Sequence, residues 1–115
     1  MRSVFSDDSE RPQAKIQRHD TRSYGVTGMM TFESVTELWR QSENMFADNT
    51  VVEIDLTEVT RTDSAGLALL VEWMRGASRQ GGRVEFLNLP SQMLELARVS
   101  NLEHLLVDER AREQS

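Results

Sequence analysis

The sequence predicts one α/β domain in which helices pack on a mixed β-sheet, with the element order β-β-α-β-α-β-α-β. Three observations lead to this prediction. Short runs rich in β-branched residues alternate with longer stretches whose apolar residues recur at helical spacing. The first two strands follow one another closely, as in a hairpin, whereas helices separate the later strands and favour parallel pairing. The chain has 115 residues, enough for a single core but not for two.

The N-terminal part is predicted to form the hairpin. Residues 1–12 are polar and charged, and we expect them to be a loosely ordered lead-in to a domain of residues 13–107. Residues 14–18 have the charged character of an edge strand, and residues 23–30 are its expected partner. Two glycines in the second strand indicate a bulge or a close approach of another backbone segment.

A first helix is predicted after the hairpin. Thr31 is a suitable N-cap, and apolar residues then recur at helical spacing until the chain reaches Asp48 and Asn49. Trp39 lies inside this apolar stripe. We therefore expect Trp39 to be packed in the core.

The rest of the chain alternates between strands and helices. Its predicted elements are a buried strand at residues 51–56, a helix stopped by Gly81-Gly82, a strand at residues 83–88, a third helix from Pro90 to Arg98 ended by Asn101, a short strand at residues 104–107 and a fraying polar tail at residues 108–115.

The junction between the buried strand and the central helix carries the most informative residues. About six polar residues form a loop that arrives at Asp63 and Ser64, whose side chains suit the free N–H groups of a helix's first turn. An ordinary helix cap accounts for this pair by itself. The same position also places a serine hydroxyl at the positive end of a helix dipole, where negative charge such as a phosphate is tolerated.

The strand, the loop, the string Asp63-Ser64-Ala65-Gly66-Leu67 and the aliphatic helix together resemble the STAS domain family, named for sulfate transporters and anti-sigma factor antagonists. The resemblance extends from Lys15 to Val107. It implies the STAS fold, with the same order of elements, and a functional site at the Asp-Ser turn.

At 100° per residue, the residues of the central helix fall on two distinct sides. One side carries Leu67, Leu70, Val71, Met74 and Ser78, which we expect to face the sheet. The opposite side carries Ala65, Leu69, Trp73 and Gly76. Trp73 and Leu69 then either pack laterally against another helix or belong to a partner-binding surface, since tryptophan is enriched at interface hot spots.

Composition and motifs argue against several functions. A net charge of −6 disfavours nucleic acid and direct contact with anionic membranes as partners. The chain has no cysteine and no metal-ligand spacing around its two histidines, so we expect no metal and no cofactor. Neither a glycine-rich phosphate loop nor a nucleophile elbow around Ser64 occurs, so we expect no catalysis. The polar start of the chain does not read as a secretory signal, which predicts a cytoplasmic protein.

Two branches of the STAS family remain as alternatives. In anti-sigma factor antagonists a kinase phosphorylates the serine after the aspartate, which makes Ser64 a candidate phosphorylation site. Residues 28–32 lack the acidic residues usual there in that branch. The helix after Gly66 and the segments around Leu38-Trp39 and Leu96–Leu102 are similar to STAS subunits of phospholipid ABC transporters.

The second branch implies an ATPase subunit as the partner and contact with the membrane only through the complex. The resemblance implies contacts through the turn, and the helix projection adds Leu69 and Trp73. The expected partner-binding residues are Thr62, Asp63, Ser64, Ala65, Gly66, Leu69 and Trp73.

Overall fold

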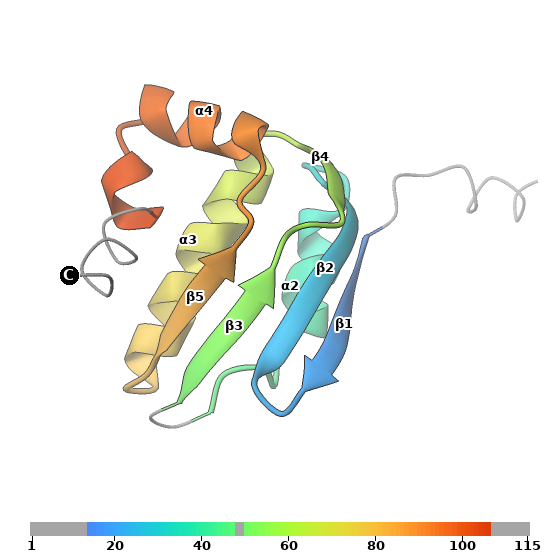
Figure 1. The fold of residues 1–115 in the computed structure, drawn as a ribbon, viewed down its shortest axis with the longest axis vertical. Helices are drawn as coiled ribbons and strands as arrows, with labels where there is room; N and C mark the ends of the chain where they lie inside the picture. Colours follow the sequence, from blue (N-terminus) through green and yellow to red (C-terminus); the bar gives the residue numbers. More distant parts are fainter. Residues whose placement is uncertain (1–13, 48–49, 107–115) are drawn as a thin grey trace, which may run out of the picture.

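The computed structural model describes residues 14–47 and 50–106 and has the predicted α/β architecture. Helices α2 and α3 lie against one face of the sheet, and α4 crosses one end of it (Figure 1). In chain order the elements are β1 (Ala14–Asp20), β2 (Ser23–Met30), α2 (Val35–Gln41), β3 (Val51–Asp55), β4 (Val59–Thr62), α3 (Ser64–Arg79), β5 (Arg83–Leu87) and α4 (Ser91–Val99).

The five-stranded sheet is mixed, as predicted. Its order is β1-β2-β3-β5, and β4 also pairs with β2. The β1–β2 hairpin is antiparallel, and β3 runs parallel to both β2 and β5. Strand β2 pairs with β3 through its first residues and with β4 through its last ones, so β3 and β4 follow one another along the same edge of β2.

The predicted irregularity of the second strand is confirmed at Gly28. This residue has a φ of 96°, and the register between β2 and β4 shifts between Gly28 and Met29. Such a backbone angle favours glycine because a Cβ atom is strained there. The bulge lies where β2 changes its partner from β3 to β4.

The core fills the space between the sheet and the helices. Residues of β2, β3 and β5 alternate between the covered and the open face, as the period of a strand requires. Buried residues from these strands and from α2, α3 and α4 meet there: Val26, Met30, Val52, Ile54, Val84, Phe86, Leu38, Leu67, Leu70, Trp73, Met93 and Ala97. No described helix covers the opposite face, which carries Glu53 and Glu85 (Figure 1).

The exposed edge of the sheet is partly closed by a side chain of α2. The backbone N–H of Ile16 in β1 donates a hydrogen bond to the Oε1 atom of Gln41 at 2.8 Å. An unpaired edge invites pairing with another chain, and Gln41 occupies one of its donors.

Three sequence predictions of local structure are wrong. The first helix begins after Ser34 rather than after Thr31, because residues 31–34 form a turn, and it ends at Gln41; Asp48 and Asn49 lie outside the described residues. The loop before Asp63 contains strand β4, since Val59 and Thr62 find backbone partners on β2. The expected last strand is instead a helical turn over residues 103–106 that buries Leu106.

The end of α4 matches its prediction. Asn101 adopts the left-handed conformation with a φ of 60°, and its N–H donates to the Arg98 carbonyl at 3.1 Å. The expected lead-in at residues 1–12 and the tail at residues 108–115 lie outside the described residues.

Candidate functional site

Asp63 is the N-cap of α3, as the sequence predicts, and it also fixes a second segment. Its Oδ1 atom accepts hydrogen bonds from the N–H groups of Ala65 at 2.9 Å and Gly66 at 3.3 Å. Its Oδ2 atom accepts a bond from the N–H of Phe32 at 3.1 Å. One carboxylate therefore joins the start of α3 to the turn that precedes α2, and both its oxygens are engaged within the fold.

Ser64 is the first residue of α3 and is exposed. Its hydroxyl lies at the helix N-terminus, where the unpaired N–H groups create a positive partial charge. Ala65 beside it is half-buried. Of the expected partner-binding residues, Ser64 is therefore the one most open to contact.

Thr62 and Gly66 are buried under the turn rather than exposed on it, so they do not lie on the surface where the expected partner contact would be made. The Thr62 hydroxyl donates to the Met30 carbonyl at 3.1 Å, and the Thr62 N–H donates to the Oε1 atom of Gln92 at 3.2 Å. A Cβ atom on Gly66 would approach the Thr62 Oγ1 atom to 2.3 Å. The buried Thr62 and Gly66 therefore fix the position of the turn through their contacts with β2 and α4.

Leu69 and Trp73 are also buried, with exposed fractions of 5% and 0%. The projection placed residues 67, 70, 71, 74 and 78 toward the sheet. The buried residues are 66, 67, 69, 70, 73 and 77, so Leu67 and Leu70 are buried as expected, whereas Val71, Met74 and Ser78 are not. The reason is that α3 contacts α2 and α4 as well as the sheet, so its buried side is turned toward these neighbours. Trp73 belongs to the lateral packing that the sequence left as the alternative.

Two aromatic residues are exposed where the sequence did not place them. Trp39 on α2 is 44% exposed, which contradicts its expected position in the core, and Phe32 in the turn before α2 is 80% exposed. Leu38 takes the buried position of this short helix instead. One sign of this exposure is present in the sequence, because the apolar residues predicted for this helix form a row wider than one helix face can bury.

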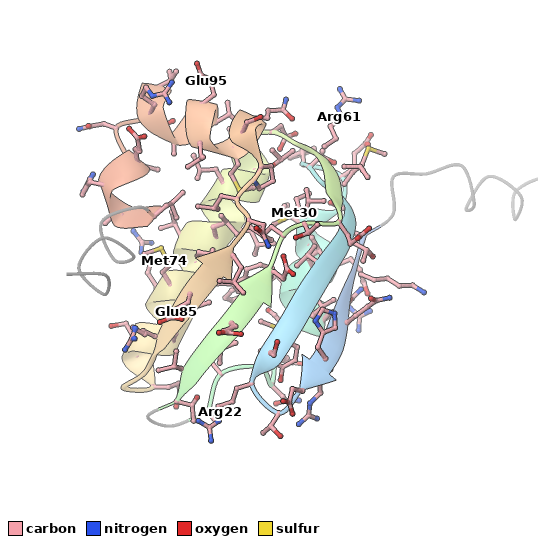
Figure 2. The ribbon with its side chains drawn as sticks, in the orientation of Figure 1. Arg22, Met30, Arg61, Met74, Glu85 and Glu95 are labelled. Carbon is pink, nitrogen blue, oxygen red and sulfur yellow. The ribbon has the colours of Figure 1, made fainter. Side chains whose placement is uncertain are left out.

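Two hollows flank the start of α3. The first, of about 580 Å³, is bordered by Phe32, Arg61, Ser64 and Leu96 among others. The second, of about 480 Å³, lies between α2 and α3 and is bordered by Val35, Thr36, Trp39, Ala65, Ala68, Leu69 and Glu72. Arg61 extends outward from β4 at the upper end of the molecule (Figure 2). We call Ser64, Ala65, Ala68, Trp39 and Phe32 the docking surface.

A hydrogen-bond network on the open side of the sheet fixes the connection between β3 and β4. The Oδ1 atom of Asp55 accepts bonds from the Thr57 hydroxyl at 2.6 Å, the Thr57 N–H at 2.9 Å and the Nδ2 atom of Asn88 at 3.0 Å. The Thr57 hydroxyl, then Asn88 and the Thr57 N–H, lower the pKa of Asp55. The network holds the bend that leads into β4 and so to Ser64.

Over residues 14–47 and 50–106, the histidines, aspartates and glutamates form no group of three that could hold a metal ion. The same part of the chain contains no helix with the length and apolar character needed to cross a membrane.

Comparisons with known proteins agree with this fold. The family described as Mlab, STAS domain, matches residues 23–108, and the chain belongs to that family. The intermembrane phospholipid transport system binding protein MlaB of Escherichia coli (strain K12) is 31% identical over 87 residues, which is 76% of this chain and 86% of that protein. MlaB of Shigella flexneri matches with the same identity and coverage.

Two solved structures share the fold at low sequence identity. The unphosphorylated anti-sigma factor antagonist SpoIIAA superposes with a TM-score of 0.56 at 14% identity, over 75% of this chain and 82% of its own. The murine anion transporter Slc26a9 gives a TM-score of 0.51 at 13% identity, over 89% of this chain and 20% of its own. Both likenesses support the STAS fold.

Proposed function

We propose that this protein is a non-catalytic subunit that binds the ATPase of a phospholipid-transporting ABC transporter and supports its assembly. The observation that carries the proposal is the docking surface: an exposed serine at a helix N-terminus, followed by Ala65, which borders an apolar hollow together with the half-exposed Trp39. The E. coli relative is by name a binding protein of a phospholipid transport system, which supports the same class of partner.

The chemistry of the docking surface suits a protein partner. Tryptophan and phenylalanine are enriched at interfaces, and small residues allow a close approach of a second backbone. Ala65 and Ala68 provide that space beside Trp39. The partner would cover the apolar hollow between α2 and α3 and reach the Ser64 hydroxyl at its edge.

In this proposal the protein works in the cytoplasm and meets the inner membrane only through its complex. The transporter it supports would maintain the lipid asymmetry of the outer membrane. Neither a cofactor nor a bound metal takes part.

The test is co-purification with an ABC-transporter ATPase of the same organism, followed by affinity measurement on variants. Trp39→Ala should weaken binding by about 2 kcal/mol, or roughly 30-fold, because a half-exposed aromatic at the centre of an interface is a typical hot spot. Ser64→Tyr should also weaken binding because the larger side chain blocks close approach.

Val99→Ala is the control, since Val99 is 82% exposed and lies on α4, and it should bind as the unmodified protein does. The proposal fails if the ATPase does not bind, or if Trp39→Ala and Ser64→Tyr both bind as tightly as Val99→Ala.

A second candidate function is supported by the exposure of Ser64. We propose as the alternative that the protein is an anti-sigma factor antagonist, switched when a serine kinase phosphorylates Ser64. A phosphate adds about two negative charges to the turn and would repel an acidic or apolar partner surface. Recovery of a serine kinase and an anti-sigma factor, with no ATPase, would decide for this alternative.

A further inference from the structure

Phe32 is exposed to an unusual degree for a large apolar residue. Its side chain is 80% exposed, although it lies next to a well-packed core. Burying a phenylalanine side chain contributes about 1.5–3 kcal/mol, and the fold forgoes nearly all of this gain. A partner that covers the ring would recover it.

The turn that carries Phe32 is held in place by several hydrogen bonds. The Ser34 N–H donates to the Thr31 carbonyl at 2.8 Å, and the Thr31 N–H donates to the Ser34 Oγ atom at 3.0 Å. The Ser34 hydroxyl in turn donates to the Met29 carbonyl. Binding through a segment that is already ordered loses less conformational entropy, so an exposed side chain on such a turn is a favourable anchor.

The same turn is coupled to the start of α3. Asp63 accepts the Phe32 N–H through Oδ2 while it caps α3 through Oδ1, and Phe32 and Ser64 border one hollow of about 580 Å³. The aromatic ring and the serine hydroxyl are therefore presented together. A partner that contacts Ser64 lies within reach of Phe32.

We propose that Phe32, which borders the same hollow as Ser64, is a second anchor of the docking surface in addition to Trp39, and that it inserts into an apolar pocket of the ATPase subunit. This inference rests on the proposed function and specifies its partner: a surface with one apolar pocket for a benzyl side chain, separate from the part that covers Trp39. The occupant is a pocket rather than a projecting side chain, because Phe32 itself protrudes.

The experiment compares two exposed apolar residues of similar accessibility. Phe32 and Val99 are 80% and 82% exposed, so truncating either should leave the urea midpoint nearly unchanged. Phe32→Ala should weaken binding to the purified ATPase by about tenfold or more, whereas Val99→Ala should stay within about twofold. Phe32→Leu, which keeps an apolar side chain, should lie between Phe32→Ala and the unmodified protein.

The outcomes separate this inference from the proposed function. If Trp39→Ala weakens ATPase binding but Phe32→Ala behaves like Val99→Ala, the second anchor is refuted and the proposed function stands. If the unmodified protein does not bind the ATPase, both are refuted. If Phe32→Ala reduces the free energy of unfolding by as much as it reduces the free energy of binding, Phe32 supports the fold rather than the interface, and the inference is wrong.

Discussion

The two tryptophans of this chain lie in opposite environments although both belong to helical apolar stripes. Trp73 in α3 is completely buried, whereas Trp39 in α2 is 44% exposed. Helix α3 is enclosed by the sheet, α2 and α4, whereas the close contacts of α2 within the described residues are with β1 and α3. The difference teaches that the number of elements packed around a helix decides which of its apolar residues stay exposed and available to a partner. Helical spacing alone does not decide this.

The largest expected effect is the loss of stability on truncating Trp73, the buried tryptophan. Trp73→Ala should reduce the free energy of unfolding by about 3–5 kcal/mol, because the ring leaves a cavity that the surroundings fill only partly. That is a large part of the ~5–15 kcal/mol typical of a whole domain. Urea denaturation followed by circular dichroism measures the change.

A matched variant tests the role of the ring. No described residue accepts a hydrogen bond from the Trp73 Nε1 atom, which is buried. Trp73→Phe keeps an aromatic ring and removes an unpaired donor whose burial costs about 1–3 kcal/mol. It should therefore destabilise the protein much less than Trp73→Ala. Equal losses for the two variants, or no loss for Trp73→Ala, would contradict the buried position of Trp73.

The same contrast between a buried and an exposed residue occurs at the start of α3, between Gly66 and Ser64. Gly66→Ala should cost about 1–3 kcal/mol of stability, because its Cβ atom would meet the Met30 carbonyl oxygen at 2.4 Å as well as the Thr62 hydroxyl. Ser64→Ala, two residues earlier on the exposed side, should change stability by less than about 1 kcal/mol. Thermal denaturation of both variants measures the difference, and equal midpoints would refute it.

Much of the architecture could be predicted from the sequence because its signals are local. The hairpin, the parallel later strands, the bulge and the Asp63 cap each follow from residue type and spacing. Strand β4 could not be predicted in this way. Val59–Thr62 is a polar segment that becomes a strand through its pairing with β2, about thirty residues earlier in the chain.

The candidate site was predicted as a location but not residue by residue. The turn at Asp63 and the exposure of Ser64 depend on the strand-to-helix junction, which the sequence displays directly. The buried state of Thr62, Leu69 and Trp73 and the exposure of Phe32 and Trp39 depend on how α2 and α3 pack on one face of the sheet and α4 packs across its end. That arrangement is a property of tertiary packing, which a projection of one helix does not contain.

The smallest expected effect concerns a residue that belongs neither to the core nor to the docking surface. Asp55 accepts bonds from Thr57 and Asn88, and these lower its pKa in the folded protein. The folded state thus binds fewer protons than the unfolded state below the ordinary aspartate pKa of about 3.9. The stabilisation is fully present above that pH and is lost as the pH falls through the lowered pKa of the folded protein.

Asp55→Asn should therefore flatten the loss of stability as the pH falls below the ordinary aspartate pKa of about 3.9, measured as the urea midpoint against pH. Thr57→Ala removes the donor with the largest effect, so it should raise the pKa of Asp55 toward its ordinary value and flatten the same range. Neither variant should change affinity for the partner as Trp39→Ala does, because neither residue borders the docking surface. If the urea midpoint of both variants falls with acid pH as steeply as that of the unmodified protein, the network adds nothing to stability. The bend into β4 is then held by strand pairing alone.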